Sequence, residues 1–476
     1  MPKQVLAVFF ALYLIANLFN LGKLDFSYKE AKNAIISLQM NKSGNYKWQT
    51  VLGKPYFKKP PLGAYYTSIL FKIFGENQWQ ARFGQFVFVI LTALLPFILK
   101  NEFEGIDPFY FASIYLTTVI VLLSVNTYSL YPSAVFFLFM ALIKVYFRQK
   151  NFEVWLVLAF LTLGLSAIFL FYVILLCLAV LEKNKELISI KEHLVALILI
   201  LFLSLFGIAL YGLNINSIHY LVGSLFLGFL ESFDFKNYMG HLISFPFIAF
   251  FLLLPWSIFI KNFFRKYDTR LYRFALNGSI AVFFLMWILP FENYLILVPF
   301  FASLASFYKV NIDSFYLKLV AIFTIILISG AILFGYLFAK GSNYLLLLIF
   351  SVFVVVFLYQ LSKKYALEQY MYIVVFMICA KAAYSMVYVP YKASYMPDVS
   401  VYGKKIANII LKNKAKYVMS NNVHLDLLYY VEKESNLPIY IPQKSKGVLI
   451  TQNKEVLKKV YGSEFSPYGV FYVGEY

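Results

Sequence analysis

Long apolar runs, separated by short polar segments, dominate the pattern of this chain. About thirteen of them approach the 20 or so residues that a membrane-spanning helix needs. The pair at 153–181 is short for two crossings and predicts either a tilted hairpin or one long helix. The pattern predicts an α-helical polytopic membrane protein with spans near 4–22, 79–99, 107–125, 132–147, 153–167, 169–181, 193–213, 242–260, 273–290, 294–308, 316–338, 344–361 and 370–389. No small-residue cleavage site follows the first run, so we expect it to be retained.

The longest polar interruption of the N-terminal part is residues 23–78. Within it, apolar positions at 28–40 recur with helical spacing on one stripe, which is typical of a helix lying on a membrane surface. Gly44 marks its end. Pro60 and the proline after it open a second short apolar segment, 62–75, which predicts another interfacial helix.

The last stretch, 390–476, has a different composition. Amphipathic helical patterns such as 401–414 alternate there with short β-branched and aromatic runs such as 446–452. This alternation predicts a small α/β domain in water. We therefore expect two domains, a transmembrane domain at 1–389 and an α/β domain at 390–476.

Composition supports a membrane protein. Hydrophobic residues make up 61% of the 476 and charged residues only 14%, well below the roughly 25% charged of soluble domains. The net charge of +19 comes from clusters between apolar runs and does not indicate a nucleic-acid partner. The two cysteines, Cys177 and Cys379, lie within apolar segments, so neither a disulfide framework nor a thiolate metal site is expected.

The basic clusters also predict orientation, because cytoplasmic loops of membrane proteins are enriched in Lys and Arg. Five clusters fall on one side of the membrane, at 144–150, 183–191, 261–273, 309 and 363–364. We therefore expect a cytoplasmic N-terminus, with the 23–78 loop and the C-terminal domain outside. The lysine-rich 23–78 loop opposes this assignment, but a loop that binds anionic lipid phosphates would need such charge.

Charged groups of the 23–78 loop and the next span are the candidates for chemistry. Lys58 and Lys59 stand where an outward loop meets the membrane, which suits a phosphate headgroup, and Arg82 could complete a phosphate clamp. The alternative is that these cations anchor helices at the interface. Asp25 and Glu30 could act as a general base or could merely pair with nearby lysines.

Histidines offer one further candidate. His241 lies at the outward mouth of a predicted span and could carry a proton. The other three, His193, His219 and His424, show no ligand spacing, so no metal site is predicted.

The run from Ala34 to Arg82 resembles the first outward loop of the GT-C polyprenol-phosphate-sugar glycosyltransferases. This group includes the aminoarabinose transferases of lipid A and the protein O-mannosyltransferase-like (family 39 type) enzymes. Matches to the family pattern are Ala34, Ile36, Met40, Ser43, Gly44, Gly53, Pro55, Tyr56, Phe57, Lys59, Pro60, Pro61, Leu62, Phe74, Gly75, Ala81 and Arg82.

The resemblance implies a GT-C-like fold and assigns Lys59 and Arg82 to the lipid phosphate. It also exposes departures. Lys29 stands at the family's catalytic Asp, Lys58 replaces the acidic residue of its F-E-K-P-P motif, and the turn at 126–132 lacks the second carboxylate. Asp25, one turn before Lys29, or Glu30 could substitute as the base.

The function implied is transfer of a sugar from a polyprenyl-phosphate carrier to an outer-leaflet lipid, glycan or protein acceptor. This would place the chain in a bacterial inner membrane, among membrane lipids and in cell-envelope or lipopolysaccharide modification, with no cofactor. The alternative is a catalytically inactive relative that binds polyprenol-linked lipids as an envelope-assembly partner. A transporter is less favoured, because the spans are nearly free of charges.

Overall fold

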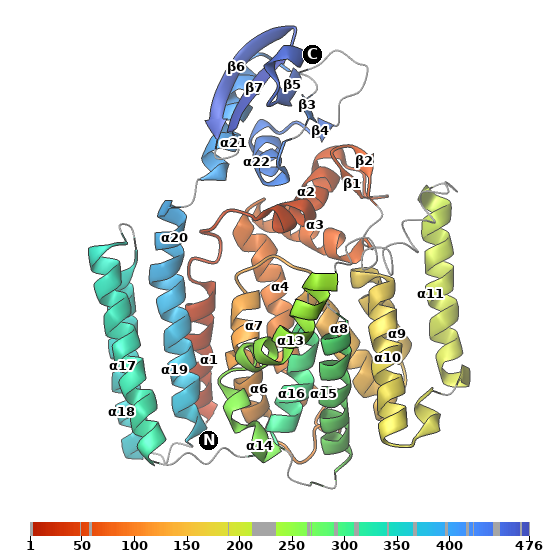
Figure 1. Ribbon diagram of the computed structural model, residues 1–476, viewed down its shortest axis with the longest axis vertical. Coiled ribbons are helices and arrows are strands. Elements are labelled where there is room, and N and C mark those ends of the chain that lie inside the picture. The colour runs from red at the N-terminus through yellow and green to blue at the C-terminus, as the bar shows by residue number, and fades with distance from the viewer. Residues whose placement is uncertain are drawn as a thin grey trace.

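A bundle of helices carries a smaller region of helices and sheet on one end (Figure 1). The computed structural model describes residues 3–475 except 48, 57–59, 189, 212–234, 264–266, 268, 290–293, 309–313, 340–341, 365–368, 396–397, 416–417, 422, 441–447 and 467–468. The N-terminus lies at the opposite end of the bundle from the sheet. The 23–78 loop and the C-terminal region lie together at the other end, as the predicted orientation requires. The side of the membrane on which that end lies stays a prediction.

Each predicted apolar run coincides with helix. The bundle comprises α1 (Lys3–Leu18), α4 (Gln78–Ala93), α5 (Leu95–Ile98), α6 (Pro108–Thr117), α7 (Val119–Ser124), α8 (Tyr131–Tyr146), α9 (Phe152–Leu163), α10 (Leu165–Leu181), α11 (Ile190–Tyr211), α13 (Phe235–Leu252), α14 (Ile260–Phe263), α15 (Arg270–Ile288), α16 (Leu297–Ala305), α17 (Ser314–Leu337), α18 (Tyr344–Lys364), α19 (Tyr370–Ala383) and α20 (Val389–Tyr395). Three described helical stretches are long and apolar enough to cross a membrane alone, or four with one bent pair. The span count of thirteen stays a prediction.

Several helices are interrupted. Gly164, with φ 76°, separates α9 from α10, so 153–181 is a pair of helices rather than one long helix. The predicted kink at Pro255 is a 100° bend between α13 and the following helical turns. Thr118, in extended conformation, separates α6 from α7. A π-helical turn, Tyr384–Tyr388, joins α19 to α20.

Two helices lie across the end of the bundle below the sheet, as Figure 1 shows for α2 (Tyr28–Ser43) and α3 (Leu62–Phe74). They correspond to the two interfacial helices that the sequence predicts. Helix α2 begins with a capping box of Ser27 and Glu30 and ends at Gly44, whose φ of 67° is the left-handed conformation that favours glycine. A short hairpin, β1 (Thr50–Val51) and β2 (Lys54–Pro55), lies between the two helices.

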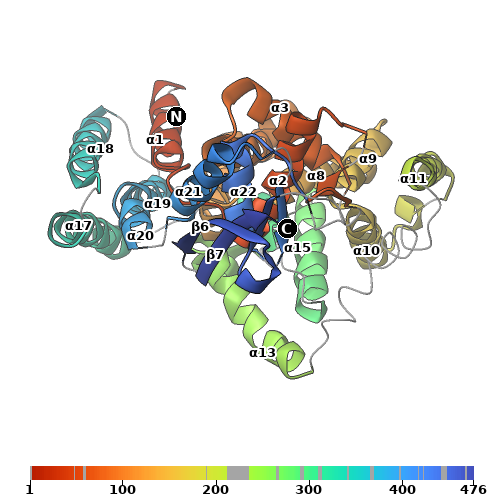
Figure 2. The same ribbon diagram turned by 90° about the horizontal axis from the view of Figure 1, so that it is seen from above.

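The C-terminal region is the small α/β unit that the alternating pattern predicts. Its strands are β3 (Val418–Asn421), β4 (Ile439–Tyr440), β5 (Val448–Thr451), β6 (Lys459–Ser466) and β7 (Gly469–Glu475), in the order β4-β3-β5-β7-β6. Strand β3 pairs in parallel with β4 and β5, whereas β7 pairs antiparallel with β5 and β6. Helices α21 (Val399–Lys412) and α22 (Leu425–Ser435) accompany the sheet. Seen from above, this unit covers the centre of the bundle (Figure 2).

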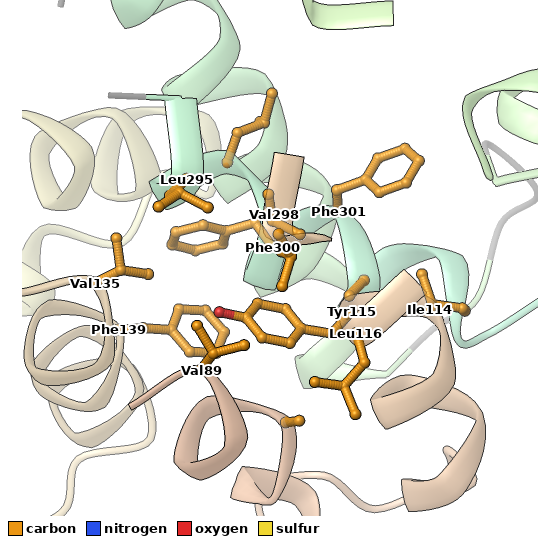
Figure 3. Close-up of a cluster of buried hydrophobic side chains, with 14 of the residues drawn as sticks. Val89, Ile114, Tyr115, Leu116, Val135, Phe139, Leu295, Val298, Phe300 and Phe301 are labelled. Atoms are coloured by element: carbon orange, nitrogen blue, oxygen red, sulfur yellow. The ribbon is translucent and has the colours of Figure 1, made fainter. Parts of the chain in front are cut away.

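Two large apolar cores and a small third cluster hold the described part of the molecule together. In the bundle, Phe139 and Phe300 meet edge to face with ring centroids 5.0 Å apart (Figure 3). Gly278 permits this approach, because a Cβ there would lie 2.2 Å from the Phe300 ring. The second core joins the 23–78 loop to the C-terminal region through buried residues such as Ile35 and Leu428. Burial of this apolar surface fixes the sheet region against the loop.

Candidate active site

A cavity of about 1060 Å³ opens where the two parts of the molecule meet. Its walls come from residues 22–28 and 30, the start of α4, the end of α7 and the turn after it, the π-helical turn, α20 and the N-termini of α21 and α22. Carboxylates of Asp25, Asp398 and Asp426 line it together with the cations Lys23 and Lys392. The cavity therefore offers both acidic and basic groups on its walls.

Asp25 lies on the wall of this cavity, and each of its carboxylate oxygens accepts a hydrogen bond from the protein. Gln78 Nε2 donates to Oδ1 at 3.1 Å, and the Ser400 backbone N–H donates to Oδ2 at 3.0 Å. Burial raises the pKa of the Asp25 carboxyl, the Asp398 carboxylate adds to this rise, and hydrogen bonds from Ser400 and Tyr430 oppose it. A general base works best when its pKa lies near the pH at which the enzyme operates, so a carboxyl with a raised pKa suits this role.

Asp398 immediately precedes a helix that lies far along the chain from Asp25. It caps α21, accepting from the Val401 N–H at 3.3 Å and from the Ser400 hydroxyl. Ser400 thus contacts both carboxylates, one through its backbone N–H and one through its side chain. The C-terminal region thereby supplies part of the candidate site.

Glu30 and Arg82, which also line the cavity, belong to a polar network of protein groups. Glu30 Oε1 accepts from Arg82 Nε at 3.0 Å and from the Tyr128 N–H at 2.7 Å. Its Oε2 accepts from both the N–H and the hydroxyl of Ser27 at 2.9 Å. Arg82 also donates to the backbone carbonyls of residues 21, 24 and 25. This buried network ties the end of α1, the start of α2 and α4 together.

The other predicted site residues are placed differently. Lys58 and Lys59 lie outside the described residues, so their phosphate-binding role stays a prediction. Lys29 is exposed in the first turn of α2 and is not among the residues that line the cavity. His241, on α13, also lies away from the described cavity lining, with Nε2 3.0 Å from the Met286 carbonyl.

Sequence reasoning missed the contribution of the C-terminal region. Asp398, Ser400, His424 and Asp426 all line the cavity, yet no local pattern connects them to Asp25. The signal that was available is that Asp398 and His424 each immediately precede a helical pattern, where N-caps are found. Helices α21 and α22 both begin at the cavity, so the residues at their N-termini line it together.

Comparison with known proteins supports the same family. Residues 58–211 match the family described as Dolichyl-phosphate-mannose-protein mannosyltransferase. An undecaprenyl phosphate-alpha-4-amino-4-deoxy-L-arabinose arabinosyl transferase of Serratia proteamaculans is 30% identical over 148 residues, 31% of this chain and 26% of the relative. The corresponding protein of Edwardsiella ictaluri is 36% identical over 118 residues, 24% of this chain and 21% of the relative. The resemblance to the GT-C polyprenol-phosphate-sugar glycosyltransferases is confirmed.

Solved structures extend the likeness to the whole fold. ArnT from Cupriavidus metallidurans bound to undecaprenyl phosphate superimposes with a TM-score of 0.61 over 99% of this chain and 97% of that one, at 14% identity. The same protein in the apo state gives 0.60 at 15% identity. At this identity the likeness shows a shared GT-C fold. The aligned region of this chain spans only about a quarter of the length of the Serratia and Edwardsiella transferases.

Proposed function

We propose that this chain is a membrane glycosyltransferase that takes a sugar from a polyprenyl-phosphate carrier and passes it to a lipid or glycan acceptor of the bacterial envelope. The observation that carries the proposal is the 1060 Å³ cavity with the partly buried Asp25 on its wall. The resemblance to the polyprenol-phosphate-sugar glycosyltransferases supports the class of donor. The comparisons do not support the alternative of a catalytically inactive relative.

In this proposal Asp25 is the general base. The acceptor hydroxyl gives its proton to the Asp25 carboxylate while its oxygen attacks the anomeric carbon of the sugar. The bond between that carbon and the phosphate oxygen breaks, and the polyprenyl phosphate leaves with the electron pair. Configuration at the anomeric carbon inverts, because attack and departure occur on opposite faces.

Glu30 and Arg82 are positioning residues in this account. All four of the hydrogen bonds to Glu30 come from protein donors, so its carboxylate is already occupied. Arg82 is likewise engaged with Glu30 and three carbonyls. Their network holds the residue 21–30 segment in the shape that presents Asp25. Lys58 and Lys59 remain the proposed ligands of the leaving phosphate, whose negative charge grows as the bond breaks.

The test is transfer by the purified full-length chain in liposomes that contain an undecaprenyl-phosphate-linked sugar and an envelope lipid fraction. Mass spectrometry would follow loss of the donor and gain of sugar mass on the acceptor. We expect sugar-dependent release of undecaprenyl phosphate. Failure to consume any of a panel of pentosyl, hexosyl and aminosugar donors, by a protein that binds undecaprenyl phosphate, would overturn the enzymatic assignment.

A further inference from the structure

A lysine inside the bundle has no place in the proposed chemistry so far. Lys381 lies on α19, within the stretch Tyr370–Tyr395 that is apolar and long enough to cross a membrane. It is 4% exposed. Ionisable groups in such segments are costly and usually serve a function.

The ammonium of Lys381 lies against two elements of the cavity. Its Nζ donates to the Leu122 carbonyl at 2.7 Å and lies 5.3 Å from the centre of the Tyr384 ring. Tyr384 lines the cavity, and so does Leu123, the neighbour of Leu122. The side-chain amine is therefore located directly behind the cavity wall.

This charge has no carboxylate partner among the described residues. The printed contacts of Lys381 are a neutral carbonyl and an aromatic ring, whereas Arg82, one of the other cations at the cavity, is paired with Glu30. A buried cation without a counter-charge is unfavourable. It becomes favourable when an anion binds within reach.

Two more polar groups nearby lack partners in the described part of the chain. Asn126 Nδ2 and Ser385 Oγ are buried and form no hydrogen bond there. Asn126 lines the cavity, and Ser385 directly follows Tyr384 in the π-helical turn. Buried polar groups are nearly always satisfied, so these donors indicate a missing acceptor. Together with Lys381 they supply N–H and O–H groups that match the oxygens of a phosphate.

We propose that Lys381, with Asn126 and Ser385, forms an anion site at this wall of the cavity, and that its ligand is a phosphate group. The inference rests on the proposed function, which requires a phosphate in this cavity. On binding, the flexible lysine side chain turns from the Leu122 carbonyl to the phosphate oxygen. The site thereby holds the carrier phosphate before and after the sugar leaves.

The experiment measures binding of undecaprenyl phosphate and of undecaprenol to the full-length protein in detergent, for the parent and for Lys381→Met and Lys381→Arg. Lost charge-assisted hydrogen bonds should weaken undecaprenyl phosphate binding by roughly 10- to 100-fold in Lys381→Met, while binding of the neutral undecaprenol stays unchanged. Lys381→Arg should retain most of the affinity. Lys318→Met, an exposed lysine of α17, is the matched control and should bind like the parent.

A second readout separates ligand binding from a purely structural role. Removal of an unpaired buried charge should raise the melting temperature of the ligand-free protein in Lys381→Met. If Lys381 serves only to fasten α19 to α7, the melting temperature should fall instead and phosphate binding should persist, which would overturn the proposal. This readout also applies to Lys381→Gln should the Met variant be poorly folded.

Inorganic phosphate, titrated into the same proteins, distinguishes the source of the anion. One outcome is that inorganic phosphate stabilises the parent but not Lys381→Met, while undecaprenyl phosphate does not bind the parent. This would support the anion site and contradict a lipid-linked donor, and hence the proposed function. Equal undecaprenyl phosphate affinity in the parent and Lys381→Met would overturn the site while leaving the proposed function intact. Absence of binding by both ligands to the parent would overturn both.

Discussion

Asp25 and Glu30 stand five residues apart in the sequence and line the same cavity, yet their hydrogen-bond surroundings are opposite in character. Around Glu30, four protein donors, one of them the Arg82 guanidinium, close a buried network. Around Asp25, the carboxylate borders a large cavity beside a second carboxylate, Asp398. The difference teaches that the same loop uses one carboxylate to hold its own architecture and leaves another less fully hydrogen-bonded at the cavity wall.

The closed region should respond to mutation through stability. Glu30→Ala leaves the buried Arg82 without its counter-charge, and loss of one partner of a buried ion pair costs about 3–5 kcal/mol. We expect a clear drop in the melting temperature of the detergent-purified protein. Glu434→Ala, which removes a carboxylate that is 34% exposed and 3.9 Å from Lys433, is the control and should cost under about 1 kcal/mol. Equal effects would contradict the distinction between the regions.

The contact between α2 and α22 should make stability depend on pH. Glu432 is fully buried, and burial raises its pKa from 4.5 to about 8, while Gln39 Nε2 donates to it at 2.9 Å. Between these two pH values the folded state holds a proton that the unfolded state has released. Stability should therefore fall as pH rises through this window, by at most about 1.4 kcal/mol per pH unit from this group.

Glu432→Gln removes that titration and keeps the side-chain shape. Melting temperatures of the parent and the variant, measured from pH 5 to 8.5, should diverge in favour of the variant as pH rises. Parallel curves would show that Glu432 remains charged in the folded protein. The hydrogen bond from Gln39 to Glu432 would then join the loop to the C-terminal region with Glu432 ionised.

The open region should respond more subtly, through the pH profile of transfer. The Asp398 carboxylate raises the pKa of Asp25, and the proposed mechanism requires Asp25 to be deprotonated. Asp398→Asn should therefore move the acidic limb of the profile to lower pH. Asn remains a good helix N-cap, so α21 should persist and the melting temperature should change little. An unmoved acidic limb would separate Asp398 from the base.

Much of the fold follows from local pattern. The helical stripe at 28–40, the glycine that ends it and the strand-like runs after residue 415 were sufficient to predict α2 and the sheet, because periodicity and turn residues act over short distances. The placement of Asp25 depends instead on Ser400 and Gln78, contacts that tertiary packing creates between segments without a shared motif.

The sequence was also ambiguous about individual charges. It presented Asp25 and Glu30 as equal candidates. Only the folded chain shows that Ser27, Arg82 and Tyr128 donate hydrogen bonds to the Glu30 carboxylate. It likewise gave Lys381 no prominence, although a single lysine within the apolar run at 370–389 was a signal. The cost of burying that charge becomes apparent only when its neighbours are known.

The most direct measurement is the transfer rate of Asp25→Asn at saturating donor, together with its affinity for undecaprenyl phosphate. The account predicts a rate about 100-fold or more below that of the parent, as expected for loss of a general base, with affinity and melting temperature unchanged. A rate within twofold of the parent would contradict the account, because the proton of the acceptor would then have to pass to another group.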